Sequence, residues 1–139
     1  MRRILVTGSR KWMDRRSIWT ALEDQYLLSP KGIVVVHGAA EGADDIADRW
    51  AWCAKQMGRV VDVEAHPPDY DKHARNRAPL VRNKEMAELG AFVCLAFPLE
   101  GGTGTRHMMS RAMAAGIEVI NHGYQPYTQQ AREFVAAYG

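Results

Sequence analysis

The sequences ILVTG at residues 4–8 and IVVVHG at residues 33–38 determine which class of fold this chain can form. Each is a continuous apolar run closed by a glycine, which is typical of a strand buried on both faces of a parallel sheet. A helix fits between them, because Asp14 can cap its start and Ser29 and Pro30 can end it. The apolar residues of this helix recur at helical spacing and are Ile18, Ala21, Leu22 and Tyr26. The three segments predict one β-α-β unit.

Strand and helix patterns continue to alternate along the rest of the chain. Further strands are expected at residues 60–63, 92–97 and 117–120, and further helices at about 44–58, 79–90, 106–116 and 128–138. The segment 66–78 lacks apolar periodicity, so we expect it to be irregular and exposed. The alternation predicts one doubly wound, Rossmann-like α/β domain over residues 1–139, with about five mostly parallel strands and helices on both faces of the sheet.

The length and composition agree with a single packed domain. The chain has 139 residues, of which 47% are hydrophobic and 24% charged, and this excludes disordered, collagen-like and coiled-coil classes. No apolar run approaches the ~20 residues that a membrane helix requires, and no export signal precedes Ile4. Cys53 and Cys94 lie in apolar stretches without paired spacing, so we expect reduced, buried thiols in a cytoplasmic protein.

The basic residues are unevenly distributed, although the formal net charge is only +2. Six of the 18 Lys and Arg residues fall within the first 16 positions, and five more fall between Lys72 and Lys84, where no acidic residue interrupts them. A net charge this small does not by itself imply a nucleic-acid partner. If the two basic segments meet in space, they form a local site for an anion.

Three glycine-rich segments follow the first, second and fourth predicted strands. They are Thr7-Gly8-Ser9-Arg10, His37-Gly38-Ala39-Ala40-Glu41-Gly42-Ala43-Asp44 and Gly101-Gly102-Thr103-Gly104-Thr105. Ligands of parallel sheets bind beyond the carboxyl ends of the strands, where a glycine-rich loop at a helix N-terminus offers backbone N–H groups to phosphate. None of the three segments is a Walker loop or a Gly-x-Gly-x-x-Gly dinucleotide motif. The first two can also be plain β-α turns, whereas the 101–105 segment exceeds what a turn requires.

Polar side chains outside these backbone loops can complete an anion site. Arg10, Lys11 and Arg82 can pair with a phosphate group, and we expect Arg82 in the first turn of its helix. Asn83 follows in an otherwise apolar helix and can read a base or ribose edge. A solvated surface position is the alternative for each of these residues.

The remaining candidate groups predict little chemistry. The five histidines lack metal-ligand spacing and no nucleophile elbow is present, so we expect neither a metal nor a cofactor. Trp50 and Trp52 point to nearly opposite sides of one helix, so at least one must meet solvent, a loop or another subunit. A homodimer contact and ordinary packing both agree with this pattern.

These motifs, in this order over residues 4–121, resemble the SLOG superfamily and in particular its small YspA/YpsA-related branch of bacteria and phages. The resemblance rests on Ile4-Leu5-Val6-Thr7-Gly8-Ser9-Arg10, the 37–44 turn, the pair Arg82-Asn83, the 101–105 segment and Ala114-Ala115-Gly116-Ile117-Glu118-Val119. The superfamily has a Rossmann-like fold that binds nucleotides or nucleotide-derived ligands, and it includes the Lonely Guy phosphoribohydrolases and the DNA-processing protein DprA. The resemblance implies that the 101–105 segment holds phosphate and that Arg82 and Asn83 lie near the ribose or phosphate.

One departure from the hydrolases within this superfamily bears on activity. Their Gly-Gly-x-Gly-Thr loop is followed, two positions on, by a glutamate that serves N-glycosidic cleavage, whereas Arg106, His107 and Met108 follow here. We therefore expect a non-catalytic nucleotide-binding module or sensor. The alternatives are a nucleoside 5′-monophosphate phosphoribohydrolase with a relocated acid and, third, a single-stranded DNA-binding protein. The possible relocated acids are Glu41, Asp44, Glu85 and Glu100, although Asp44 is already explained as the cap of the helix that begins near it.

The expected nucleotide-binding residues come from all three loops and the Arg82-Asn83 pair. They are Gly8, Ser9, Arg10, His37, Gly38, Glu41, Gly42, Asp44, Arg82, Asn83, Gly101, Gly102, Thr103, Gly104 and Thr105.

Overall fold

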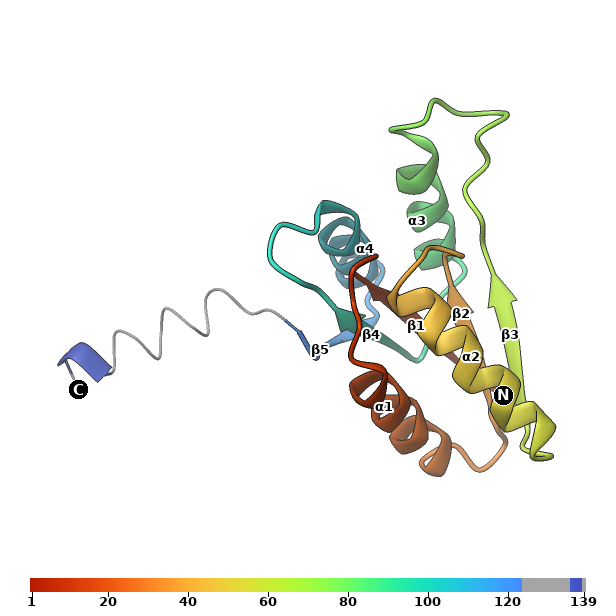
Figure 1. The fold of residues 1–139 in the computed structure, drawn as a ribbon. Helices are drawn as coiled ribbons and strands as arrows, with labels where there is room; N and C mark the ends of the chain where they lie inside the picture. The colour runs from red at the N-terminus through yellow and green to blue at the C-terminus, as the bar shows by residue number, and fades with distance from the viewer. Residues whose placement is uncertain (124–135, 139) are drawn as a thin grey trace.

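The computed structural model describes residues 1–123 and 136–138. Its strands are β1 (Arg2–Gly8), β2 (Ile33–His37), β3 (Val61–Ala65), β4 (Val93–Phe97) and β5 (Glu118–Asn121). They form one parallel sheet in the order β3-β2-β1-β4-β5 (Figure 1). The direction of winding reverses between β1 and β4, so the carboxyl ends of these two strands flank the crevice where ligands of such sheets bind.

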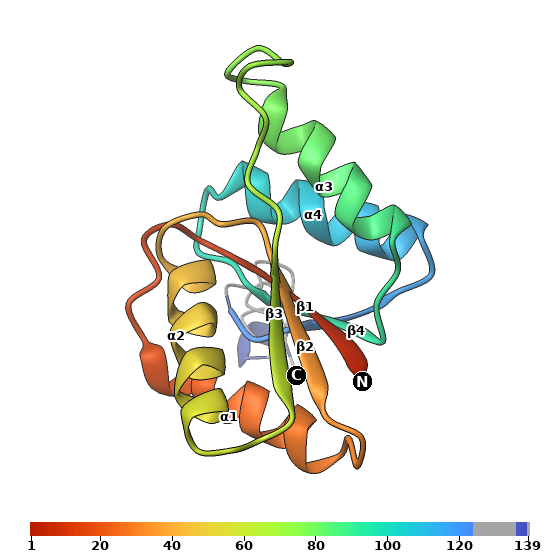
Figure 2. The ribbon, with the colours of Figure 1, turned by 90° about the vertical axis from the view of Figure 1, so that its right-hand side faces the viewer.

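Two helices cover each face of the sheet (Figures 1 and 2). On one face, α1 (Arg15–Leu27) packs beside α2 (Ala43–Gln56), and on the other, α3 (Ala78–Glu88) packs beside α4 (Thr103–Ala114). The predicted doubly wound, Rossmann-like α/β fold is therefore confirmed. The irregular segment between β3 and α3 extends away from the sheet as a long excursion (Figure 2).

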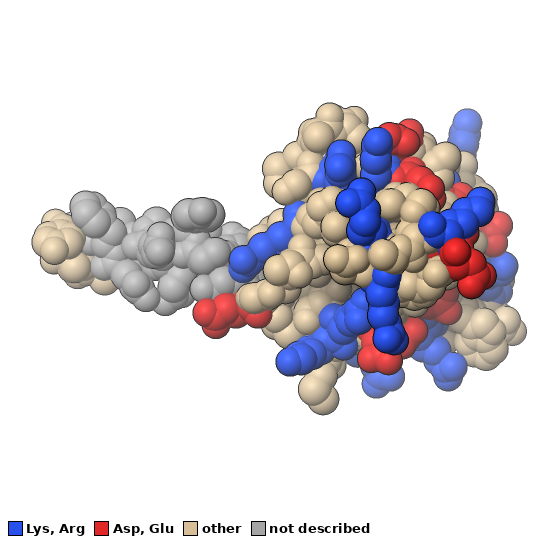
Figure 3. All heavy atoms as spheres, turned by 90° about the horizontal axis from the view of Figure 1, so that it is seen from above, with Lys and Arg blue, Asp and Glu red and all other residues tan. Residues whose placement is uncertain are grey.

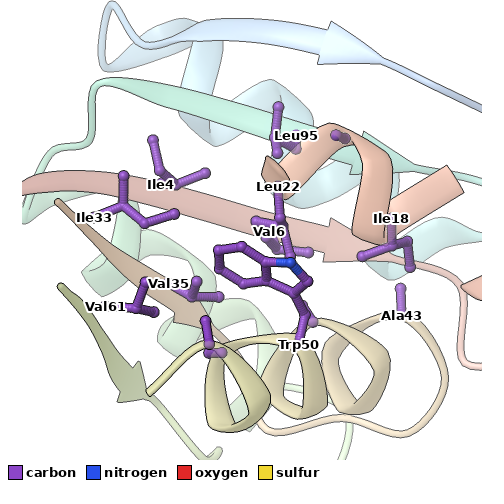
Figure 4. Packing of buried hydrophobic residues seen from close by; sticks show 14 of the residues in the cluster. Ile4, Val6, Ile18, Leu22, Ile33, Val35, Ala43, Trp50, Val61 and Leu95 are labelled. Atoms are coloured by element: carbon purple, nitrogen blue, oxygen red, sulfur yellow. The ribbon is translucent and has the colours of Figure 1, made fainter. Parts of the chain in front are cut away.

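The two faces of the sheet carry separate apolar clusters, and the larger one lies beneath α1 and α2. Figure 4 shows Trp50 of α2, which is only 2% exposed, lying over Val6 and Val35 of the sheet. Side chains alternate along a strand, so Leu5 faces the opposite cluster, which includes Met108 of α4. Full burial of one such aliphatic side chain contributes roughly 1.5–3 kcal/mol. These two clusters fix the positions of all four helices, and with them the loops that connect strands to helices.

The helix starts follow local chemistry, with one departure from expectation. Asp14 is the N-cap of α1, as predicted, and its carboxylate accepts a hydrogen bond of 3.4 Å from the Ser17 amide. Asp44 does not cap α2. The N-cap of that helix is Gly42, whose φ of +72° is in the left-handed region, and Asp44 lies within the first turn. The prediction of an Asp44 cap was wrong because its carboxylate reaches back to the preceding loop instead.

Other expectations are met in part. Cys94 is buried, which raises the pKa of its thiol to about 12, but Cys53 is only partly buried. Trp52 is 52% exposed while Trp50 is buried, so one indole meets solvent as the spacing required. The helix expected at 128–138 lies outside the described residues except for 136–138, which are helical. Among the helices the structure describes, none has the length and apolar character needed to cross a bilayer.

Candidate functional site

The loops that leave β1 and β2 pack against each other at the carboxyl edge of the sheet. The backbone N–H of Ser9 donates to the Phe97 carbonyl at the end of β4 (3.0 Å), and the N–H of Ala43 donates to the Ser9 carbonyl (3.1 Å). The start of α2 is thereby tied to the first loop. Two of the three glycine-rich segments therefore meet at the point where the winding reverses.

The glycines of these two loops are required by contacts within the protein. A Cβ at Gly8 would lie 2.5 Å from the Cβ of Ala43, and a Cβ at Gly42 would lie 2.5 Å from the Arg10 carbonyl oxygen. A Cβ at Gly38 would lie 2.6 Å from Cζ of Arg82. At Gly8 and Gly42 such distances leave no space for a larger residue, whereas at Gly38 a larger residue would have to displace the end of the Arg82 side chain. The interpretation of these loops as closely packed β-α turns explains all three glycines.

The 101–105 segment is different because its glycines face open space. A Cβ at Gly101 or Gly104 would have no atom within 4 Å, and the nearest atom to a Cβ at Gly102 would be 3.5 Å away. Gly102 is the N-cap of α4 and provides no side-chain cap, so the N–H groups of the first turn have no side-chain acceptor within residues 1–123 and 136–138. Thr103 is exposed, and Thr105 is buried. The segment thus presents open backbone donors at the positive end of a helix dipole.

Arg82 reaches from α3 across this edge of the sheet. It lies in the second turn of α3, not in the first turn as predicted. Its Nη1 donates to the carbonyls of Gly38 and His66, the latter at 3.2 Å, and its Nε donates to Oδ1 of Asn83 (2.8 Å). Burial lowers the pKa of the Arg82 guanidinium, the charges of Asp44 and Tyr70 raise it, and the nearby charge of Arg10 lowers it again. The first and second basic segments of the sequence do therefore meet here.

The positive charge of Arg82 is not balanced by an ion pair. Its three acceptors are all neutral amide oxygens, and within residues 1–123 and 136–138 it forms no salt bridge. In the same part of the chain, Nη2 of Arg82 has no hydrogen-bond acceptor. A half-buried cation with a free donor favours an incoming anion.

Asn83 lies beneath the site, at 3% exposure. Besides accepting from Arg82, its amide donates from Nδ2 to the Gly104 carbonyl (3.4 Å) and to Nδ1 of His107 (3.1 Å). One side chain therefore joins α3 to the first turns of α4. The expected contact of Asn83 with a base or ribose edge does not fit this position, because protein partners occupy both its oxygen and its nitrogen.

Asp44 and His37 also face the protein. Oδ2 of Asp44 accepts from the N–H groups of Gly38 (3.0 Å) and Ala40 (3.2 Å), and Oδ1 is buried without a partner among the described residues. Burial raises the pKa of Asp44. His37 is 4% exposed, accepts from the Ala39 amide at Nδ1 (3.0 Å), and hydrogen-bonds through Nε2 to Asp48 (2.7 Å). Both side chains shape the β2–α2 loop.

The other candidate side chains are open to solvent. Arg10, Lys11, Glu41, Glu85 and Glu100 are exposed. Seen from above this edge, Lys and Arg side chains are spread over the surface with Asp and Glu between them (Figure 3). The described part of the chain contains no group of three His, Cys, Asp or Glu side chains placed to hold a metal ion.

Sequence reasoning did not assign a role to His107. The structure places it in α4 against Asn83, and burial together with the charge of Arg111 lowers its pKa. The feature of the sequence that could have indicated a role for His107 is its position shortly after the 101–105 segment, within the first turns of a helix that begins with glycines.

Comparison with known proteins now adds to this geometry. The model of the family described as "YspA, cpYpsA-related SLOG family" matches residues 2–73, and these residues contain the first two glycine-rich loops. This chain belongs to the YspA, cpYpsA-related SLOG family. The expected superfamily and branch are therefore confirmed, while Arg82 and the 101–105 segment lie outside the matched region.

A relative of this SLOG chain is known from a phage. "Gene 61 protein" of Mycobacterium phage D29 is 56% identical over 126 residues, which cover 91% of this chain and 100% of the phage protein. No solved structure gives a significant match to the chain.

Proposed function

We propose that this protein binds a nucleotide or nucleotide-derived ligand through its phosphate group, beside Arg82 and the first turn of α4, as a non-catalytic binding module. The observation that carries the proposal is the Arg82 guanidinium, which is half-buried, forms no ion pair among the described residues and keeps Nη2 without an acceptor.

Phosphate fits the chemistry of this site better than a neutral ligand does. Removing a guanidinium from water costs free energy. Neutral oxygen acceptors and the nearby charge of Asp44, which forms no ion pair with Arg82, offset this cost in part, and an anion in direct contact supplies the missing interaction. Phosphate oxygens accept from arginine in short, charge-assisted hydrogen bonds. The same Asn83 amide contacts both Arg82 and the Gly104 carbonyl, so the guanidinium and the open helix start belong to one surface. Membership of a SLOG family supports a nucleotide as the bearer of that phosphate.

Isothermal titration tests the proposal with four nucleoside 5′-monophosphates and the four matching nucleosides. We expect saturable binding of at least one monophosphate and at least tenfold weaker binding of its nucleoside. Arg82→Gln should lower the affinity for the monophosphate at least tenfold, because one charge-assisted hydrogen bond contributes roughly 1.5–3 kcal/mol. Arg49→Gln removes an equal charge from the exposed outer side of α2 and should leave affinity unchanged. If no monophosphate binds, or if the two variants behave alike, the proposal is wrong.

The second candidate is N-glycosidic hydrolysis of a nucleoside monophosphate, and one observation favours it. Asp44 is a buried carboxyl group with a raised pKa and with one oxygen that has no partner among the described residues, which are properties of an acid catalyst. Chromatography of incubated monophosphates for free base distinguishes the candidates, and a binding module releases none. Hydrolysis through Asp44 requires that Asp44→Asn abolish base release, since asparagine keeps an acceptor for the loop amides but has no acidic proton.

A further inference from the structure

The orientation of the Asn83 amide is fixed by its neighbours. Nε of Arg82 is only a donor, so the group that faces it at 2.8 Å must be the amide oxygen. The Gly104 carbonyl is only an acceptor, so the group that faces it at 3.4 Å must be the amide nitrogen. Reversing the amide would bring two donors together at Arg82 and two acceptors together at Gly104.

This fixed amide determines the protonation of His107. The Asn83 nitrogen has two hydrogens, one for Gly104 and one for Nδ1 of His107 at 3.1 Å. Nδ1 must therefore accept and carries no proton, so the ring proton of the neutral imidazole is on Nε2. Burial and the Arg111 charge lower the pKa of His107, which favours the neutral ring.

Two side-chain donors remain unused around Asn83. Within residues 1–123 and 136–138, Nη2 of Arg82 and Nε2 of His107 have no hydrogen-bond partner. Asn83 forms a hydrogen bond with a different nitrogen of each of these side chains, Nε of Arg82 and Nδ1 of His107. Asn83 also contacts the Gly104 carbonyl in the first turn of α4, where Gly102 provides no side-chain cap for the backbone N–H groups.

We propose that Asn83 is a positioning residue that orients Arg82 and holds His107 in its Nε2-protonated neutral form, so that Nη2 of Arg82 and Nε2–H of His107 are the side-chain donors for the phosphate of the ligand. This inference rests on the proposed function and assigns Asn83 and His107 their parts in it. A neutral imidazole of this kind donates a hydrogen bond without transferring its proton, which agrees with binding and not with acid catalysis.

Nitrogen-15 NMR of the histidine side chains tests, without any ligand, whether Asn83 holds His107 in the Nε2–H tautomer. At pH 7.5 we expect His107 to give the chemical shifts of the Nε2–H tautomer. In Asn83→Asp, one carboxylate oxygen still accepts from Arg82 while the other faces Nδ1, so His107 should gain an Nδ1 proton and its pKa should rise by about one unit or more. Gln56→Glu makes the same amide-to-acid change at an exposed position on α2 and should leave His107 unchanged. An Nδ1–H tautomer in the wild type, or no response to Asn83→Asp, overturns the role of Asn83.

Titration with D-ribose 5-phosphate and with inorganic phosphate tests whether His107 donates to the phosphate of the ligand, because both probes carry the phosphate and neither carries a base. His107→Phe keeps a ring but removes the donor, and we expect about fivefold to twentyfold weaker binding. His107→Gln supplies a neutral acceptor for Asn83 and a neutral donor for phosphate, and it should recover most of the affinity. His73→Phe, in the excursion before α3, is the matched control.

The outcomes separate the two proposals. If the wild-type protein binds neither probe nor any monophosphate, the proposed function fails, and the NMR result still decides whether Asn83 sets the His107 tautomer. If ribose 5-phosphate binds and His107→Phe binds it equally well, the proposed function stands and the assignment of His107 is wrong. Circular dichroism of each variant checks that a loss of affinity is not a loss of folding.

Discussion

At the scale of single residues, glycine has two opposite roles in this protein. Gly8, Gly38 and Gly42 are small because another part of the chain occupies the space where a side chain would be. Gly101 and Gly104 have nothing near them. The sequence predicted three glycine-rich loops but could not separate these roles, because the distinction depends on what each glycine faces after folding.

The open space at Gly104 leads to a prediction in which stability and binding change in opposite directions. Gly104→Ala places a methyl group in a helix where it meets no atom, and we expect the free energy of unfolding to rise by about 0.5–1 kcal/mol. The same methyl group occupies the approach to the first turn of α4, so affinity for ribose 5-phosphate should fall at least fivefold. Urea unfolding and calorimetric titration measure the two effects.

Ser110→Ala provides the comparison for Gly104→Ala. Ser110 is exposed on α4, away from its first turn, so alanine there should raise helix stability slightly and leave binding unchanged. Full affinity in Gly104→Ala would contradict a ligand at the start of α4.

At the scale of elements, one cluster of charged side chains links β1, β3 and the turn before β4. Arg3 donates to both carboxylate oxygens of Glu64 at 2.6 and 2.7 Å, and its Nε donates to the Gly90 carbonyl at 2.9 Å. His66 contacts the same carboxylate at 2.6 Å. Hydrogen bonds from Arg3 and His66 hold the pKa of Glu64 at about 2, below its ordinary value of 4.5.

This cluster predicts how stability depends on pH. The folded-state pKa of Glu64 is lower than its unfolded value, so its contribution is fully present above pH 4.5 and is lost as pH falls toward 2. Glu64→Gln should lower the free energy of unfolding at pH 7 by about 1 kcal/mol, a modest figure because Glu64 is partly exposed. Urea unfolding from pH 7 to pH 2 should show the two curves converging at the acid end.

Glu88→Gln is the control for that series, since Glu88 pairs with Lys84 only at 3.8 Å on an exposed face of α3. Its curve should follow the wild type throughout. A constant difference between Glu64→Gln and wild type across the pH range would mean that the ionised form of Glu64 is not the source of the stability.

The elements themselves were largely predictable, because apolar periodicity and glycine or proline punctuation act locally. The strands, the Asp14 cap and the irregular excursion after β3 all follow from neighbouring residues. The pair formed by Arg3 and Glu64 does not, since 61 positions separate the two residues along the chain. The cap of α2 was also misassigned, because the Asp44 carboxylate had better partners in the folded loop than at the helix end.

At the scale of the whole molecule, the parallel sheet brings together candidate residues that are far apart in sequence. The alternation of strands and helices predicts a parallel sheet in which the loop after β1 and the start of α3 lie at the same edge, so the meeting of Arg10 with Arg82 could be anticipated. The direction in which each side chain points could not be anticipated from the sequence. His37, Asp44 and Asn83 all lie in the expected region, yet their polar atoms bind the protein itself.

The mixture of charges at this edge predicts a weak dependence on salt. On the face that Figure 3 shows, acidic side chains lie among the basic ones, a pattern that favours contact with a single phosphate group over contact with many phosphates of a nucleic acid. Between 50 and 200 mM NaCl we expect the affinity for ribose 5-phosphate to fall by less than about tenfold, whereas a protein contacting 6–10 nucleic-acid phosphates loses about 10³-fold or more. Titrations at both salt concentrations measure this.

Fluorescence anisotropy with a labelled single-stranded oligonucleotide, at the same two salt concentrations, is the companion measurement. Tight oligonucleotide binding with a steep salt dependence would favour the DNA-binding alternative over a small ligand.

The contrast between filled and open loops also bears on how such a protein can diversify. The turns after β1 and β2 interlock through Ser9, Gly42 and Ala43, so a larger residue in either turn must displace backbone. In the turn before α4, no comparable contact restrains Gly101 or Gly104, although the φ of +83° at Gly101 still favours glycine at that position. Inherited or engineered changes of ligand preference should therefore accumulate in that one turn, while the interlocked pair stays nearly invariant among descendants that still fold.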